Sequence, residues 1–264
     1  MLKLQKPSLA NGKRDGIIYG ESGVGKTVIS VTAPGPIIRL EFPVGEGRQP
    51  DLPISHLGID KFVIESYSDL MTVWGALAGK VPNVDQGDPE IAGTVGFDKD
   101  VITELMKQIR AVNPVTIVID SLGAALEGIL LQHSRDFRGN KGVKNWGDLS
   151  EMAPWVLDRF LALPYNIVMT CLRERVVDEG TGRVMYQPAL PGRAQSKTVF
   201  PRLDYILHLF VSKDKERMLR LQTGDDHICK LRIPPTIELP DIITANLTDV
   251  FNLVTKAQEC IHND

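Results

Sequence analysis

The sequence predicts an α/β fold in which helices flank a mainly parallel central sheet, with antiparallel strands added at the C-terminal edge. Short apolar runs recur along the chain, and Val115–Ile119 is a run without a charged residue. Such runs are typical of strands that are buried on both faces of a parallel sheet. Helical segments separate the runs, and strands that alternate with helices imply a doubly wound parallel sheet.

The parallel strands are predicted from short apolar runs bounded by turn or helix signals. In chain order they are Ile17–Tyr19, Ile37–Phe42, Lys61–Glu65, Val115–Ile119 and Asn166–Thr170. The first of these strands directly precedes a glycine-rich loop, and the fourth ends in Asp120.

The helices between these strands are predicted from apolar residues at helical spacing and from signals at the helix ends. A short helix over about 25–33 is stopped by the sequence Pro34-Gly35-Pro36, because proline cannot continue a helix. Asp98 caps another helix, and Pro114 marks its end. Further helices are expected at about 68–79, 122–132 and 149–163.

Beyond Thr170 the alternation of strands and helices stops. Residues 174–190 are predicted to form a β-ribbon or mobile loop with a turn at Glu179–Gly182. Strands at Tyr205–Val211, Met218–Thr223 and Cys229–Ile233 are expected to extend the sheet in antiparallel fashion, and a last helix at about 247–261 has one apolar face. No segment resembles a linker, so residues 1–264 are interpreted as one domain with a loop insertion at 80–98.

Composition argues against several classes of protein. The chain has 264 residues, 43% of them apolar, and a formal net charge of −3, which is ordinary for a globular domain. This charge gives no global attraction to nucleic acid or membranes, so any nucleic-acid site must be a local basic patch. The three cysteines lack CxxC spacing, which fits a reducing cytosol. Without a long apolar run or a signal-peptide core, a cytoplasmic protein with no membrane contact is expected.

The segment 20–27, GESGVGKT, matches the phosphate-binding pattern GxxxxGK[ST] in full. Gly23 and Gly25 permit backbone angles that a Cβ would block, so that N–H groups can surround phosphate oxygens. Lys26 would carry a charge to the β- and γ-phosphates. The alternative is a chance glycine-rich turn, but a strand before the motif and a helix after it are both predicted. ATP is therefore expected to contact Gly20, Glu21, Ser22, Gly23, Val24, Gly25, Lys26, Thr27 and Val28.

A metal site is predicted from Thr27 and Asp120. The hydroxyl of Thr27 can join the ligand shell of Mg²⁺, which prefers hard oxygen ligands. Asp120 ends a predicted parallel strand, and ligands bind in the crevice outside the carboxyl ends of such strands. An aspartate in this position is also a common helix cap. Beside a P-loop, the role of Asp120 in orienting a water molecule on Mg²⁺ is the favoured interpretation.

Four sequence features together resemble the RecA-like P-loop ATPases. They are IIYGESGVGKT, the strand that ends in Glu41, TIVIDSLGAAL, and NIVMTCLRE with the later stretch LPGRAQSKTVFPRLDYIL. More closely, they are similar to phage-encoded nucleotide-binding proteins of this class, which include ATP-dependent single-strand-annealing proteins. The resemblance spans about residues 14–210, and it implies a RecA-like fold and Mg²⁺-dependent ATP hydrolysis.

The resemblance also implies catalytic roles. Glu41 occupies the place of the carboxylate that activates the attacking water, although Glu46 is a nearby competitor. Either Thr170 or Cys171 stands where the family has a polar γ-phosphate sensor, and Arg173, two residues beyond, is a third candidate for contact with the phosphate. Arg193 and Lys197 lie in the region from which one subunit reaches the neighbour's triphosphate, which implies a ring or filament of identical subunits.

Two loops of the family hold single-stranded DNA, and the resemblance places them here at 134–147 and 174–192. The first loop has a local charge of +3 and includes aromatic residues for base stacking. The implied DNA contacts are Arg135, Arg138, Lys141, Lys144 and Trp146 of the first loop and Arg175 of the second. The alternative is that both loops are ordinary solvated loops, with Trp146 packed on the core.

The leading functional hypothesis is a RecA-like ATPase that acts on single-stranded DNA in phage recombination, annealing or replication, within the host cytoplasm and alongside a single-strand-binding protein. Two alternatives remain open at this stage. One is a small-molecule kinase, although no lid with arginines is visible in the 80–98 segment. The other is a nucleotide-gated binding or scaffold module with little turnover, because Cys171 is a weak hydrogen-bond donor.

Overall fold

The structure is a computed structural model that describes residues 12–43, 54–80, 97–177, 180, 182–191, 195–233 and 237–262. Most of the predicted insertion at 80–98 therefore lies outside the described residues, as do Glu46 and Arg193.

A ten-stranded sheet forms the centre of the protein, with the strand order β10-β8-β7-β1-β5-β4-β2-β3. Two further strands branch from this path, because β6 pairs with β5 and β9 pairs with β7. In chain order the strands are β1 (Asp15–Gly20), β2 (Ile37–Glu41), β3 (Asp60–Val63), β4 (Thr116–Asp120), β5 (Asn166–Val177), β6 (Val184–Pro188), β7 (Tyr205–Val211), β8 (Arg217–Arg220), β9 (Lys230–Leu231) and β10 (Ile242–Thr244).

The predicted fold class is confirmed. All six strands from β3 to β7 along the sheet pair in parallel, and antiparallel strands lie at the edge next to β7. One prediction about this edge is wrong: β7 runs parallel to β1, and only β8, β9 and β10 are antiparallel to their neighbours. The short helix α7 (Gln195–Val199) precedes β7 and returns the chain to the amino end of β1, which allows the parallel pairing.

The main helices are α1 (Lys26–Ser30), α2 (Tyr67–Ala78), α3 (Lys99–Val112), α4 (Leu122–Ala124), the π-helix η3 (Ala125–Leu131), α5 (Gln132–Arg138), α6 (Val143–Leu161) and α8 (Leu247–His262), with single 3₁₀ turns at η1 (Ser55–Leu57) and η4 (Phe200–Arg202). Most of the main helices fall on predicted segments, whereas α5 and the first turns of α6 lie where a loop was expected. As predicted, Asp98 caps α3, since its side chain accepts hydrogen bonds from the N–H groups of Asp100 and Val101. Among the described residues, no helix is both long and apolar enough to cross a membrane.

The predicted polar loop at 134–147 is wrong, because α5 and α6 occupy most of it and only residues 139–142 lie between them. Asn145 explains the compact corner between α5 and α6, which we call the α5–α6 corner. Its buried amide donates to the hydroxyl of Ser134 at 3.0 Å and to the carbonyl of Gly139 at 3.1 Å, and its oxygen accepts from the N–H of Lys141 at 2.7 Å. Polar residues here therefore satisfy one another instead of forming a solvated loop.

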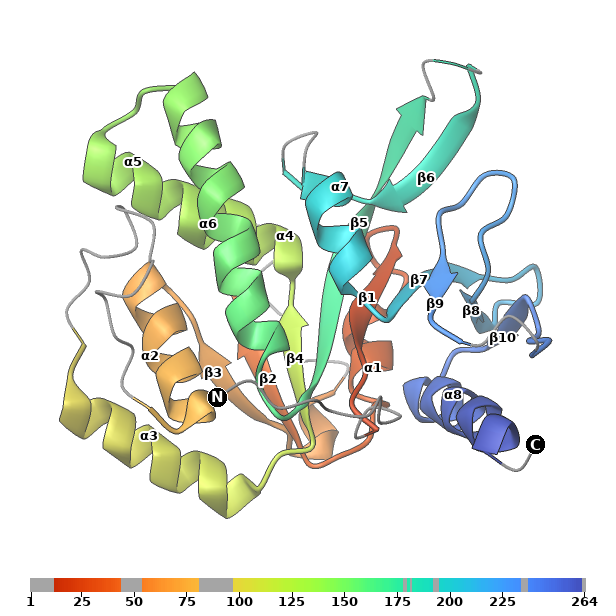
Figure 1. Cartoon of the computed structure of the whole chain (residues 1–264), viewed down its shortest axis with the longest axis horizontal. Helices are drawn as coiled ribbons and strands as arrows, with labels where there is room; N and C mark the ends of the chain where they lie inside the picture. The colour runs from red at the N-terminus through yellow and green to blue at the C-terminus, as the bar shows by residue number, and fades with distance from the viewer. Residues whose placement is uncertain are drawn as a thin grey trace.

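Two apolar cores cover the two faces of the sheet. Figure 1 shows α2, α3 and α6 on one side of the sheet and α1 with α8 on the other. Neighbouring residues of a strand face opposite cores, as in β4, where Ile117 and Ile119 face the first side and Val118 faces the second.

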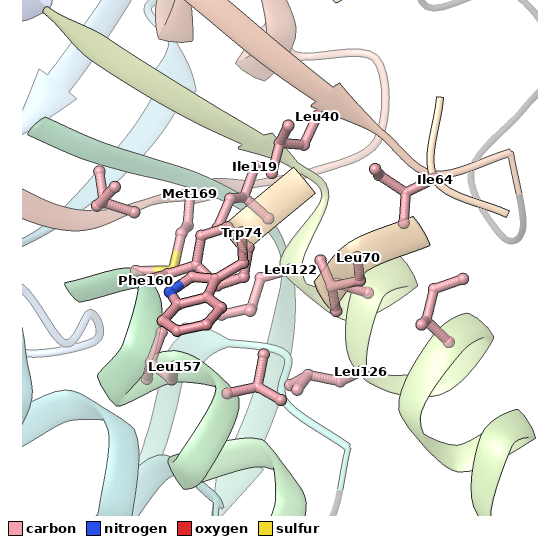
Figure 2. Close-up of a cluster of buried hydrophobic side chains, with 14 of the residues drawn as sticks. Leu40, Ile64, Leu70, Trp74, Ile119, Leu122, Leu126, Leu157, Phe160 and Met169 are labelled. Atoms are coloured by element: carbon pink, nitrogen blue, oxygen red, sulfur yellow. The ribbon is translucent and has the colours of Figure 1, made fainter. Parts of the chain in front are cut away.

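The larger core lies between the sheet and helices α2 and α6 (Figure 2). Trp74 of α2 is buried at its centre, and its indole N–H donates to the carbonyl of Arg159 on α6 at 3.0 Å. This bond ties the two helices to each other on the same face of the sheet. The side chains labelled in Figure 2 are Leu40, Ile64, Leu70, Trp74, Ile119, Leu122, Leu126, Leu157, Phe160 and Met169.

We predict that His208 makes the stability of this fold depend on pH. Its ring is buried on β7 and stacks on His227 with 3.9 Å between the ring centroids. Burial, together with the nearby His227, Arg173 and Arg220, lowers the pKa of His208 to about 3. The unfolded chain takes up the proton first, near pH ~6.5. The contribution of His208 to the free energy of unfolding is therefore fully present above the pKa of the unfolded chain. Below it, this contribution falls by about 1.4 kcal/mol for each unit of pH, until the pH reaches the pKa of the folded protein.

Urea unfolding between about pH 7 and pH 4 measures this effect. The variant His208→Gln lacks the titrating group, so the difference in free energy of unfolding between wild type and variant should shrink as the pH falls. Replacing the exposed His56 by Gln is the control, and this variant should keep the wild-type profile. Parallel profiles for wild type and His208→Gln would contradict the assignment.

Candidate nucleotide-binding site

The glycine-rich segment lies between β1 and α1, at the carboxyl end of a central strand. Gly23 and Gly25 have positive φ angles of 76° and 101°, in the region that favours glycine. A Cβ on Gly25 would lie 2.5 Å from Nε of Arg217, which donates a hydrogen bond to the carbonyl of Val24 at 3.0 Å. The backbone of this loop is thus shaped by its glycines and fixed from the side by β8.

Lys26 begins helix α1 and is buried, with 7% of its surface exposed. Its ammonium donates to the carbonyls of Glu21 at 2.9 Å and Gly20 at 3.3 Å. The charge is therefore held inside the curve of the loop, which is where a phosphate group needs a cation.

Asp120 at the end of β4 joins the P-loop to the centre of the sheet. Its Oδ2 accepts a hydrogen bond from the hydroxyl of Thr27 at 2.9 Å, and its Oδ1 accepts one from the hydroxyl of Thr170 at 2.6 Å. The structure thus brings together Thr27 and Asp120, the two residues predicted to hold the metal.

Thr170 and Cys171 lie on opposite faces of the sheet. Thr170 is on the face of α1 and contacts Asp120, whereas the thiol of Cys171 points into the larger core and donates to the carbonyl of Ala189 at 3.0 Å. Of Thr170 and Cys171, Thr170 is therefore the one that lies at the site, and Arg173, the third candidate, contacts Glu21 of the P-loop.

A buried arginine that was not predicted as a site residue connects the acidic groups. The guanidinium of Arg39 contacts Asp120 at 3.3 Å and Glu41 at 2.9 Å, and Lys61 pairs with the same Oε2 of Glu41 at 2.8 Å. The sequence signal was the charge inside the strand IIRLE. Because side chains alternate along a strand, a residue two positions before Glu41 must lie on the same face.

The donors at this site fit a magnesium ion. The Thr27 hydroxyl and the Asp120 carboxylate are both hard oxygen ligands, 2.9 Å apart. Within the described part of the chain, no cluster of three or more His, Cys, Asp or Glu side chains forms a metal cage. Magnesium typically binds through one or two protein oxygens while nucleotide phosphates and water complete its shell, and this donor set matches that pattern.

A family model described as an AAA domain matches residues 12–233, about the whole span from the start of β1 to the end of β9. The chain belongs to the AAA domain family. AAA domains of this kind are P-loop NTPases, so the match accounts for the glycine-rich loop and for the acid at the end of β4. No curated protein matches the chain.

In this AAA domain the P-loop also contacts the β5–β6 ribbon. Arg173 of β5 forms an ion pair with Glu21 of the loop, and its guanidinium lies over the ring of Tyr186 on β6, 4.2 Å from the centroid. The hydroxyl of Tyr19, in the strand that leads to the loop, lies within hydrogen-bonding distance of two carbonyl oxygens, 2.9 Å from that of Ile228 and 3.2 Å from that of Tyr186. The ribbon and the P-loop therefore share side chains.

The residues predicted to bind DNA lie at the α5–α6 corner and on the ribbon. Arg135, Lys141 and Lys144 are exposed and Trp146 is 40% exposed, whereas Arg138 is half-buried and lies 3.4 Å from the carboxylate of Asp148. On the ribbon, Arg175 is exposed and pairs in register with Tyr186. Figure 1 shows the corner and the ribbon rising from the same end of the AAA domain.

A cavity of about 930 Å³ separates the corner from the ribbon. Arg135 and Trp146 line one wall, and Leu172, Glu174 and the segment 189–191 line the other. Glu65 and Glu127 add two further carboxylates to the lining. Trp146 therefore faces this cavity and does not pack into the core.

Of the two residues implied to act in a neighbouring subunit, only Lys197 can be placed, since Arg193 lies outside the described residues. Lys197 is exposed on α7, beside a surface hollow that it lines with Gln187 and Lys230. Its position leaves the ammonium on the outside of the AAA domain.

We predict that Gly25→Ala damages the P-loop of this AAA domain more than Gly23→Ala does. Both substitutions place alanine in a left-handed conformation, at a cost of about 1–2 kcal/mol each. Only at Gly25 does the added Cβ also meet Arg217, because nothing lies within 4 Å of a Cβ at Gly23. Thermal unfolding without nucleotide should therefore show the larger loss of stability for Gly25→Ala, and equal losses would contradict the tight contact with Arg217.

Proposed function

We propose that the protein binds ATP with Mg²⁺, hydrolyses it, and couples this reaction to the handling of single-stranded DNA in phage recombination, annealing or replication. The observation that carries the ATPase proposal is the 2.9 Å contact between Thr27 of the P-loop and Asp120 of β4. Membership in a P-loop NTPase family supports the same conclusion.

Each residue of the site has a role in this proposal. The P-loop backbone and Lys26 bind the phosphate chain, while Thr27 and Asp120 would hold Mg²⁺, which neutralises charge on the phosphates when it is bound. Glu41 accepts a proton from the attacking water or orients it. Arg39 and Lys61 hold the Glu41 carboxylate in place, because their side-chain nitrogens lie 2.9 Å and 2.8 Å from its Oε2. Thr170 orients the other oxygen of Asp120.

The DNA proposal is supported by exposed cations and aromatic rings at the α5–α6 corner. Phe137 is 42% exposed and Trp146 is 40% exposed, and Lys141 and Lys144 lie between them in sequence. Aromatic side chains stack on bases while basic groups follow the backbone, a combination that suits single strands. The carboxylates of the adjacent cavity repel phosphates, so the strand is expected to run along the corner with its bases toward Trp146.

The assembly is also a proposal that follows from the resemblance. Arg193 and Lys197 would reach the triphosphate of a neighbouring subunit in a ring or filament, and the exposed position of Lys197 supports this role. A single-strand-binding protein in the host cytoplasm is the expected partner in DNA handling.

The variant Lys26→Ala should lose ATP hydrolysis. Removing the buried cation of the loop takes away a positioned charge that stabilises the transferring phosphoryl group, so phosphate release is expected to fall about a hundredfold or more. Lys107→Ala is the matched control, because Lys107 is exposed on α3 and pairs with Glu104 of the same helix at 3.1 Å. Phosphate release is measured with and without single-stranded DNA, and an unchanged rate in Lys26→Ala would refute the site.

The double variant Lys141→Glu/Lys144→Glu should bind single-stranded DNA more weakly, with a smaller dependence on salt. Each lost phosphate contact reduces the slope of log K against log[salt] by about 0.7 for single strands, so the slope should fall by about 1.4. Lys107→Glu/Arg110→Glu on α3 makes the same change in net charge and should leave both values unchanged. Fluorescence anisotropy with a labelled oligonucleotide provides the measurement, and identical slopes would exclude the corner as the DNA site.

The same assays separate the two alternative functions. Transfer of phosphate to a nucleoside in place of water would identify a small-molecule kinase. Tight ATP binding without phosphate release, even with single-stranded DNA present, would identify a nucleotide-gated scaffold module.

A further inference from the structure

Arg39 is the largest of the fully buried side chains in the described part of the chain, with 1% of its surface exposed. It lies on β2 between Val118 of β4 and Lys61 of β3, its partners in register. Burying an ionised group is strongly unfavourable unless it is paired with opposite charge. The side chain must therefore be retained by the carboxylates that it contacts.

Two such carboxylates meet at the end of β2. Glu41 and Asp120 are register partners on adjacent parallel strands, and their side chains lie on the same face of the sheet. Two negative charges on neighbouring strands repel each other unless a cation lies near both. The guanidinium of Arg39 is placed between them, with one nitrogen 3.3 Å from Asp120 Oδ2 and another 2.9 Å from Glu41 Oε2.

The contact on Asp120 falls on the oxygen that faces Thr27 of the P-loop. Oδ2 already accepts the hydroxyl of Thr27, the other metal ligand in the proposed function, whereas Oδ1 is turned to Thr170. A guanidinium at this oxygen repels a divalent cation that is held by Thr27 and Asp120, either directly or through a bound water molecule.

We propose that Arg39 is a positioning residue that acts as an internal counter-cation: it neutralises Asp120 and Glu41, and Mg²⁺ must displace it from Asp120 Oδ2 to bind. The proposal rests on the proposed function in one respect, the assignment of Thr27 and Asp120 to the metal. Its consequence is that Mg²⁺ alone binds weakly, because it replaces a cation already in place. Phosphate oxygens of a bound nucleotide add negative charge at the site, so metal and nucleotide bind together.

The variant Arg39→Gln tests this exchange with Mg²⁺ as the only ligand. Without the guanidinium, two carboxylates face each other, so the affinity for Mg²⁺ in the absence of nucleotide should rise about tenfold or more. Calorimetric titration and the shift of the unfolding temperature with MgCl₂ both report this affinity. Lys107→Gln is the control for the loss of one positive charge away from the site, because Lys107 is exposed on α3 and pairs with Glu104 at 3.1 Å. Its Mg²⁺ affinity should equal that of the wild type.

Equal Mg²⁺ affinities in the wild type and Arg39→Gln would overturn the proposal. If Arg39→Gln does not fold without metal, the double variant Arg39→Gln/Asp120→Asn tests the proposal instead. It removes the guanidinium and also the repulsion between the carboxylates of Asp120 and Glu41. Recovery of folding in the double variant supports the proposal. Failure to recover shows that Arg39 is needed only for packing and overturns it.

The outcomes for Arg39 and for the ATPase proposal are distinguishable. ATP hydrolysis by the wild type with unchanged Mg²⁺ affinity in Arg39→Gln rejects the counter-cation and keeps the ATPase. A gain in Mg²⁺ affinity in Arg39→Gln, without hydrolysis by the wild type, keeps the counter-cation and rejects the ATPase.

Discussion

The hydrogen bond between Thr27 and Asp120 depends on the order of the parallel strands. β5 lies between β1 and β4, so the P-loop that follows β1 and the acid that ends β4 are separated by one strand. Thr170 of β5 fills the gap and contacts Asp120 at 2.6 Å. Because the carboxyl ends of parallel strands meet at one edge, residues that are far apart in the sequence form one polar site there.

Electrostatic compensation keeps that site stable without a ligand. Glu41 is paired with Arg39 and Lys61, and Asp120 contacts Arg39. Each acid is thus matched by a cation from a neighbouring strand. Buried charges are tolerated only when they are paired in this way, so the network is as much a requirement of the fold as a feature of the chemistry.

The strands and the P-loop could be predicted from the sequence, whereas several tertiary features could not. Apolar runs and the GxxxxGK[ST] pattern are local signals, and they placed β1, β4 and the loop within a few residues. The parallel direction of β7 depends on how the chain returns to β1, which no local pattern encodes. The polar segment 134–147 resembled a loop because the hydrogen bonds of Asn145 that close the corner are formed only after folding. Arg39 could not be predicted as a site residue because Asp120, one of its partners, lies on another strand, and its contact with Glu41 depends on the conformation of the two side chains.

The hydroxyl of Tyr19 has a mechanical consequence. Tyr19 lies one residue before Gly20, and its hydroxyl lies within hydrogen-bonding distance of carbonyl groups of both the ribbon and the segment before β9. A load that pulls the ribbon outward is therefore transmitted along β1 to the first residue of the P-loop. A ligand that moves the Tyr186 strand of the ribbon is therefore expected to shift the backbone at the start of the phosphate loop as well.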